Sequence, residues 1–198
     1  MTRFALPAFA AGLAALTATH VAAEPAPYTV DEAHSEILFS WSHGGFSTTR
    51  GLVFDLTGDL MFDEEEPANS SVQVSFPASA MNVTPGLFQH LMTDDFFGSE
   101  DSRVTFESTS IEVTGETEGK IIGDLTINGQ TKEVTLDAEL TERGENPMGQ
   151  PTVGFEAETT ILRSDYGLGA FAPFVSDEVA IKIALEARPA DEGEASGN

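Results

Sequence analysis

The chain has 198 residues, with 33 acidic and 9 basic side chains, a formal net charge of −24 and no cysteine. The missing cysteine excludes disulfides, a thiol nucleophile, cysteine-ligated zinc and iron–sulfur clusters. Such a charge repels nucleic acid and anionic lipid surfaces, while 40% hydrophobic residues are too many for a disordered acidic chain.

Residues 1–23 have the pattern of a secretory signal peptide. Arg3 provides a positive start, residues 4–18 form an uncharged apolar stretch, and Val21-Ala22-Ala23 supplies small residues for cleavage. The apolar stretch is shorter than the roughly 20 residues that a helix needs to cross a bilayer, so we expect no stable membrane insertion. A buried N-terminal helix is the alternative. Secretion predicts a periplasmic protein whose mature chain, residues 24–198, carries −25 because it lacks Arg3.

The mature chain alternates between apolar and polar residues with period two. The clearest runs cover residues 37–41, 52–62, 72–76, 104–106, 125–127, 134–140, 153–161 and 179–185. Strands with one apolar and one polar face are typical of antiparallel sheets. In the run 52–62 this phase places Leu52, Phe54, Leu56, Leu60 and Phe62 on one buried face.

Other segments break the alternation. Asn128-Gly129 separates two runs and is a strong hairpin signal. Residues 84–92 show helical spacing, with Thr84 as the N-cap and Pro85 at the first helical position. The acidic residues 63–67 predict a solvated loop, and the Gly-, Ser- and acid-rich residues 191–198 predict a disordered tail.

The predicted strands close into a barrel or divide into a sandwich. The inward phase carries unusually large side chains: Phe39, Trp41, Phe54, Phe62, Phe76, Phe106 and Phe155. An eight-stranded barrel has an interior that side chains or one small ligand can fill. The sequence therefore favours an all-β fold, an eight-stranded antiparallel barrel with a short helical insert, over residues 24–190.

Six motifs follow one another along this domain. They are Tyr28-Thr29-Val30-Asp31 with His34-Ser35, Gly51 with Phe54, His90-Leu91-Met92 with Asp95-Phe96-Phe97, Val104-Thr105-Phe106, the hairpin 123–132, and Arg163-Ser164-Asp165-Tyr166-Gly167. In this order they resemble the YceI-like family of bacterial periplasmic, polyisoprenoid-binding proteins. The resemblance covers residues 28–187 and implies a lipocalin-like barrel whose long apolar tunnel holds an isoprenoid chain.

The histidines offer little for catalysis or metal binding. No hydrolase elbow or metalloprotease helix motif occurs in the sequence. His34 and His43 lie about 30 Å apart if the chain between them is one extended strand, too far to share a metal. His43 is in phase with Trp41 and is expected to face inward, whereas His34 is expected to hydrogen-bond the start of the first strand. We expect neither an enzyme nor a metal protein.

Polar and aromatic candidates gather near the predicted barrel ends. Arg163 is expected to face inward, where it either pairs with Asp165 in a structural ion pair or clamps a ligand headgroup. The aromatic insert is expected to plug one end of the barrel or to form part of the binding wall; it contains Phe88, Phe96 and Phe97. Phe171 and Phe174, in a Gly- and Pro-rich loop, are expected to form a mobile rim or lid.

The basic residues predict the charge of the headgroup. Lys120, Arg143 and Arg188 fall in predicted turns or the tail, Lys132 and Lys182 face outward, and only Arg50, Arg103 and Arg163 remain as donors at a barrel mouth. Burying a diphosphate needs several such donors. We therefore expect a neutral head, such as a quinone or an isoprenoid alcohol, contacted by His43, Tyr166 or Arg163.

The sequence thus predicts a carrier for a long apolar ligand, an isoprenoid lipid or quinone, and no other cofactor. The expected ligand contacts are Phe39, Trp41, His43, Phe54, Phe76, Phe88, His90, Phe97, Phe106, Phe155, Arg163, Tyr166 and Phe171. The alternative is a structural or stress-protective β-domain whose core is filled. Either protein is expected to be a monomer or a homodimer without a nucleic-acid partner.

Overall fold

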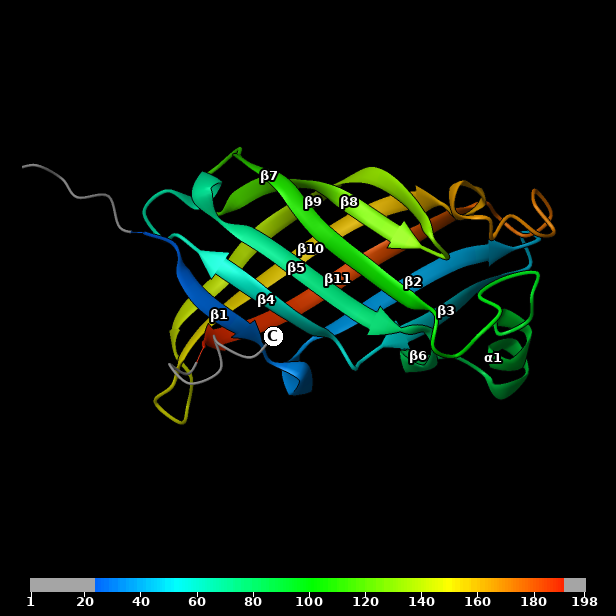
Figure 1. Ribbon diagram of the computed structural model, residues 1–198, viewed down its shortest axis with the longest axis horizontal. Helices are drawn as coiled ribbons and strands as arrows, with labels where there is room; N and C mark the ends of the chain where they lie inside the picture. The colour runs from blue at the N-terminus through cyan, green and yellow to red at the C-terminus, as the bar shows by residue number, and fades with distance from the viewer. Residues whose placement is uncertain (1–23, 191–198) are drawn as a thin grey trace, which may run out of the picture.

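The computed structural model describes residues 24–190 (Figure 1). The predicted signal peptide, residues 1–23, and the predicted acidic tail, residues 191–198, lie outside the described residues. None of the helices in the described part is long and apolar enough to cross a membrane.

Strands make up most of the described chain. They are β1 (Ala26–Val30), β2 (Glu36–His43), β3 (Ser47–Val53), β4 (Thr57–Phe62), β5 (Ser71–Pro77), β6 (Met81–Asn82), β7 (Arg103–Val113), β8 (Glu118–Ile127), β9 (Gln130–Glu145), β10 (Pro151–Leu162) and β11 (Glu178–Pro189). The helix α1 (Pro85–Leu91) lies in the predicted helical segment. Short 3₁₀ turns are η1 (Glu32–His34), η2 (Pro67–Asn69), η3 (Ala78–Ala80) and η4 (Arg163–Tyr166).

The strands close into an eight-stranded antiparallel barrel. Its wall runs in the order β1-β4-β5-β7-β8-β9-β10-β11, and β11 pairs back with β1. β11 also pairs with β2, through residues 180–184, so β1 and β2 are successive halves of one wall strand interrupted at η1. β3 and β4 share a second wall strand in the same way, since β3 pairs with β2 and β4 pairs with β1. The barrel is confirmed and the sandwich is wrong.

The hairpin signal in the sequence is also confirmed. Asn128 and Gly129 connect β8 to β9 with φ of 51° and 72°. Two successive positive φ values match the twist of a tight antiparallel hairpin, and asparagine and glycine tolerate them best.

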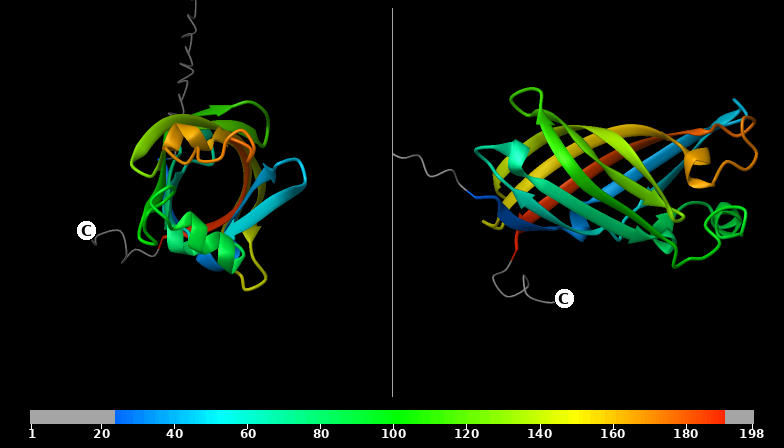
Figure 2. Two further views of the ribbon diagram at one scale, coloured as in Figure 1. Left: turned by 90° about the vertical axis from the view of Figure 1, so that its right-hand side faces the viewer. Right: turned by 45° about the horizontal axis from the view of Figure 1, so that its top comes forward.

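The barrel has two ends with different contents. At the helix end lie α1, the β2–β3 turn, the β8–β9 hairpin and the long loop 163–177 that leads into β11 (Figure 2). At the terminal end lie the start of β1, the end of β11 and the loops 63–70, 114–117 and 146–150. Loop 63–70 is not simply solvated, because Asp63 is buried and its carboxylate accepts backbone N–H bonds from Glu65 and Glu66.

The predicted phase of the run 52–62 is wrong in its first half. Val53 and Leu56 are buried and face the interior, while Phe54 is 40% exposed. The two inward positions are three apart in the sequence, not two, because the chain leaves one strand after Val53 and enters the next at Thr57. That break shifts the alternation by one residue, so Phe54 points away from the interior.

Candidate functional site

A cavity of about 930 Å³ follows the barrel axis. Apolar side chains from the inward face of nearly every wall strand line it, among them Ile37, Leu60, Val74, Leu136 and Ile183. At both ends its lining includes exposed residues, such as His90 at the helix end and Glu116 at the terminal end. The volume lies at the upper end of the 300–1,000 Å³ that small-molecule sites usually enclose.

Most predicted contact residues line this cavity. Those that do are Phe39, Trp41, His43, Phe76, His90, Phe97, Phe106, Phe155, Arg163, Tyr166 and Phe171. Phe54 and Phe88 do not: Phe54 follows the strand break, and Phe88 lies half-buried on α1. The expected contacts also left out much of the aliphatic lining, although the same period-two phase places it inward. They lacked Phe96 and Phe174 as well, which were expected only in the aromatic insert and in the rim.

Aromatic rings organise the interior. Phe39 and Trp41, two residues apart on β2, stack with ring centroids 5.9 Å apart. Toward the terminal end Phe62 and Phe155 meet edge to face at 5.6 Å. Because β2 and β10 lie on either side of β11, the two pairs of rings line the same cavity at different points along its wall.

The mouth at the helix end is built from rings on three segments. His90 of α1 packs against Phe96 at 4.9 Å and against Phe171 at 5.9 Å. On the β2 side His43 meets Phe174 edge to face at 6.0 Å. The aromatic insert is therefore both a partial plug and a part of the cavity wall, because Phe96 and Phe97 line the cavity.

Arg163 is buried beside this mouth, but it does not pair with Asp165 as predicted. Its guanidinium donates to four backbone carbonyls of the loop that follows η4: those of Leu168, Ala170, Val175 and Ser176. Burial lowers the pKa of Arg163, and the nearby Asp177 carboxylate partly offsets this shift. The guanidinium thus holds the loop in shape, and four of its five N–H groups are committed to that role.

Tyr166 offers a polar group inside the cavity. The side chain lines the cavity and is almost fully buried. Burial, with a smaller contribution from Asp165, raises its pKa to about 12. The hydroxyl therefore stays protonated at physiological pH and can donate a hydrogen bond to a ligand oxygen.

The terminal end of the cavity is acidic. Glu64, Glu116, Glu118, Glu139 and Glu142 lie along it with one cation, Arg143. The predicted place of Lys120, Arg143 and Arg188 in turns or the tail is wrong, because they belong to β8, β9 and β11. Of these, Arg143 lines the cavity, where its guanidinium lies 3.4 Å from the Glu64 carboxylate.

Arg50 and Arg103, predicted as donors at a mouth, do not line the cavity. Arg50 donates to the Thr48 carbonyl at 3.4 Å, and Arg103 donates to the Ser75 hydroxyl at 2.6 Å. Both bonds stay within the wall, so neither guanidinium is directed at a ligand in the cavity.

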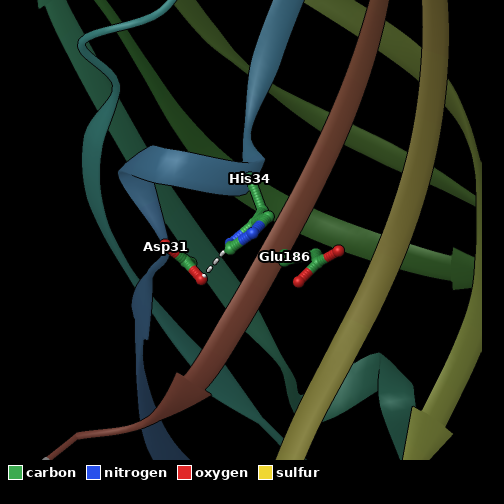
Figure 3. A group of neighbouring side chains, drawn as sticks. All are labelled: Asp31, His34 and Glu186. Carbon is green, nitrogen blue, oxygen red and sulfur yellow. Dashed lines mark hydrogen bonds and ion pairs between the residues drawn. The ribbon is translucent and has the colours of Figure 1, made fainter. Parts of the chain in front are cut away.

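A second group of titratable side chains lies outside the barrel, where η1 meets β11. Asp31, His34 and Glu186 each have a potential metal-ligating atom within 4.8 Å of the others (Figure 3). The Asp31 carboxylate already accepts from His34 Nδ1 at 2.8 Å and from the Arg188 guanidinium. A positive guanidinium on that carboxylate opposes a metal ion, so the group fits a structural ion-pair network.

Known proteins share this architecture. The YceI-like domain matches residues 28–187. A UPF0312 protein of Pseudomonas aeruginosa is 33% identical over 190 residues, which cover 94% of this chain and 98% of the relative. The crystal structure of Burkholderia cenocepacia BcnA has a TM-score of 0.71 at 24% identity, over 79% of this chain and 98% of BcnA.

A more distant structure shares the fold. It is a polyisoprenoid binding domain from Saccharophagus degradans, implicated in plant cell wall breakdown, with a TM-score of 0.58 at 14% identity over 82% of this chain and 98% of that domain. The match to residues 28–187 covers nearly all of the described barrel. By this match, and by its identity to the Pseudomonas relative, the chain belongs to the YceI-like family.

Proposed function

We propose that this protein binds a long apolar ligand, an isoprenoid lipid or a quinone, in the barrel and carries it through the periplasm. The observation that carries the proposal is the apolar cavity of about 930 Å³ along the barrel axis. A domain with a filled core, the alternative function, has no need of such a space, and close packing is the rule in protein interiors. The name of the Saccharophagus domain supports an isoprenoid chain as the occupant.

The charges around the cavity support a neutral headgroup. At the helix end the Arg163 guanidinium is already bound to the loop carbonyls, and at the terminal end Arg143 is paired with Glu64 among further glutamates. A diphosphate in either place meets too few free donors. Tyr166 and the imidazoles of His43 and His90 suit a carbonyl or hydroxyl oxygen.

Extraction tests whether the cavity is occupied. Organic extraction of the purified protein is expected to release an isoprenoid lipid or quinone that mass spectrometry identifies. A bound ligand stabilises the folded state by mass action, by about 2.7 kcal/mol at a hundredfold excess over its Kd. The delipidated protein should therefore melt at a lower temperature than the protein as purified, and added geranylgeraniol should restore the Tm. Equal Tm values with no extractable lipid would support the filled-core alternative.

Competition between geranylgeraniol and geranylgeranyl diphosphate tests the headgroup. The alcohol is expected to bind more tightly, and Tyr166→Phe should weaken it about fivefold by removing one hydrogen bond of about 1 kcal/mol. Tyr28→Phe is the matched control, because Tyr28 is the other tyrosine of the chain and does not line the cavity. Tighter binding of the diphosphate, lost on Arg163→Lys substitution, would show that the head is anionic.

A further inference from the structure

Three aromatic side chains are exposed around the mouth at the helix end. Phe46 in the β2–β3 turn is 85% exposed, and Phe171 and Phe174 in the loop before β11 are 60% and 62% exposed. We call these three residues the aromatic rim. An added Cβ on Gly44 would lie 2.9 Å from the Phe174 ring and 3.2 Å from the Phe46 ring, so these two rings flank the same residue. Figure 2 shows the turn, the loop and α1 around one opening of the barrel.

Uncharged segments surround the aromatic rim, with the nearest carboxylates at their ends, on Asp94, Asp95, Asp165 and Asp177. The segments 37–49, 83–93 and 166–176 contain no Asp, Glu, Lys or Arg, although about one residue in six of the chain is acidic, 33 of 198. These segments supply the β2–β3 turn, α1 and the loop before β11. Exposed apolar patches of this kind mark interaction surfaces in soluble proteins.

The loop presents its rings at a conformational cost. Phe171 has a φ of 65°, in the left-handed region that a bulky side chain rarely adopts. Arg163 holds the carbonyls of Ala170 and Val175 on either side of this residue, and the Val175 N–H donates to the Phe171 carbonyl at 3.0 Å. These hydrogen bonds therefore fix the backbone that holds the Phe171 ring at the mouth, where the ring lines the cavity and is also exposed to solvent.

We propose that the aromatic rim docks this protein on the surface of a zwitterionic lipid bilayer, with the mouth of the cavity facing the lipid. The proposal rests on the proposed function, because an apolar ligand that leaves a bilayer must otherwise cross water to reach the cavity. Aromatic rings suit the boundary between headgroups and acyl chains. Three partly inserted phenylalanines on two neighbouring loops give a reversible attachment that frees the carrier after loading.

The distribution of charge selects the kind of bilayer. β10 has 12 residues and spans about 40 Å, which a barrel tilt reduces to about 30 Å along the axis. The glutamates of the terminal end therefore lie well beyond the Debye length of about 8 Å at 0.15 M salt when the helix end touches a membrane. A zwitterionic surface therefore does not repel the helix end, whereas a strongly anionic surface repels the negative net charge of the chain.

Co-sedimentation with sucrose-loaded dioleoylphosphatidylcholine vesicles in 0.15 M NaCl tests the docking. The wild-type protein is expected to bind, and Phe46→Ser should lower its partition coefficient about tenfold, as expected for partial burial of one phenylalanine ring. Met148→Ser is the matched control: Met148 is 72% exposed, but it lies in the loop 146–150 at the terminal end. This variant should stay within twofold of the wild type.

Ligand binding is measured separately, as geranylgeraniol retained in native mass spectra, and Phe46→Ser should retain it because Phe46 does not line the cavity. A wild-type protein that binds geranylgeraniol but no vesicles overturns the docking and leaves the proposed function standing. A protein that binds no geranylgeraniol overturns the proposed function, whatever the vesicles show. Equal losses of vesicle binding in Phe46→Ser and Met148→Ser also overturn the docking. So does a wild-type protein that binds no vesicles but forms a dimer which Phe46→Ser dissociates and Met148→Ser does not.

Discussion

Asp31 shows how one side chain fastens the interrupted wall strand. Its carboxylate accepts from His34 within the same turn and from Arg188 on β11, while its backbone N–H donates to the Glu186 carbonyl at 2.8 Å. Burial alone would raise the pKa of this carboxyl, but the hydrogen bonds from Arg188 and His34 outweigh burial and hold the pKa below its ordinary value. The ionised form is therefore favoured by folding.

Asp31→Asn is expected to lower the free energy of unfolding by about 2 kcal/mol at pH 7, the range for hydrogen bonds to a charged group. Because the folded-state pKa is depressed, this stabilisation is complete above the ordinary pKa of about 3.9 and is lost as the pH falls through the lower folded-state pKa. Urea denaturation of both proteins between pH 3 and 7 should show the difference shrinking in acid.

Asp137→Asn is the control for that experiment. Asp137 pairs with Lys120 at 2.5 Å, but both side chains are exposed, so its loss should cost about 0.5 kcal/mol or less. A difference between wild type and Asp31→Asn that stays constant across this pH range would contradict the ionic role of Asp31.

At the level of elements, the barrel wall is interrupted in three neighbouring strands. The breaks fall at η1, between Val53 and Thr57, and at η3. Beyond them β6 pairs with β3 through two residues and has no further strand partner in the described sheet. The segment that follows α1 binds η3 just before β6, since the N–H groups of Ala78 and Ser79 donate to the carbonyls of Ser102 and Glu100 at 2.7 and 3.0 Å. The end of the helical insert is thus fastened to the third break in the wall.

The β2–β3 pair depends on one glycine. Phe39 lies opposite Gly51, and a Cβ at residue 51 would lie 2.2 Å from the Phe39 ring and 2.5 Å from the Val83 side chain. Gly51→Ala is therefore expected to lower the free energy of unfolding by about 2 kcal/mol through overpacking. Urea denaturation of the wild type and the variant measures this difference in the free energy of unfolding.

Gly86→Ala is the matched control, because an added methyl there meets nothing within 4 Å and Gly86 lies in α1. A helical alanine should leave the stability unchanged or raise it by up to about 1 kcal/mol. Equal stability of Gly51→Ala and the wild type would mean that Phe39 moves aside at no cost, and the stacked position of its ring against Trp41 would not be a rigid part of the wall.

At the scale of the whole molecule, the two ends of the barrel differ in their apolar surface and in the charge that lines the cavity. The aromatic rim and the uncharged segments lie at the helix end, whereas Glu64, Glu116 and Glu142 lie at the terminal end. Described ion pairs neutralise only a few of the carboxylates, and those between Lys182 and Glu158 and between Arg143 and Glu64 are exposed. Most of the net charge is therefore free to repel itself.

This repulsion predicts that salt stabilises the protein. Raising NaCl from 0.01 M to 1 M shortens the screening length from about 30 Å to about 3 Å, so the Tm in differential scanning calorimetry should rise. The chain without residues 1–23, which carries −25, is the protein to measure. A Tm that stays flat or falls over this range would mean that self-repulsion contributes little to its stability.

Local spacing in the sequence was enough for most of the strands, the α1 segment, the Asn128-Gly129 hairpin and most of the expected ligand contacts, but not for β1, β6 or the division of the run 52–62 between β3 and β4. Each of these correct predictions depends on burial of one face or on the backbone preferences of a few adjacent residues. The first gives a periodic pattern of apolar residues, and the second gives a short local motif. The sequence favoured a barrel over a sandwich because inward residues such as Phe39 and Phe155 are large. The order of residues alone could not show that the last strand pairs with the first.

The tertiary structure decided what depends on interrupted strands and on contacts between distant segments. Phe54 points outward because a strand break resets the alternation, and no local spacing marks that break. Arg163 donates to carbonyls of the loop that follows it, and these hydrogen bonds themselves fix the course of that loop. Its partners could therefore not be inferred from the neighbouring Asp165. Arg143 reaches the cavity, and Asp31 meets Arg188, only because the closed barrel brings together residues far apart in the chain.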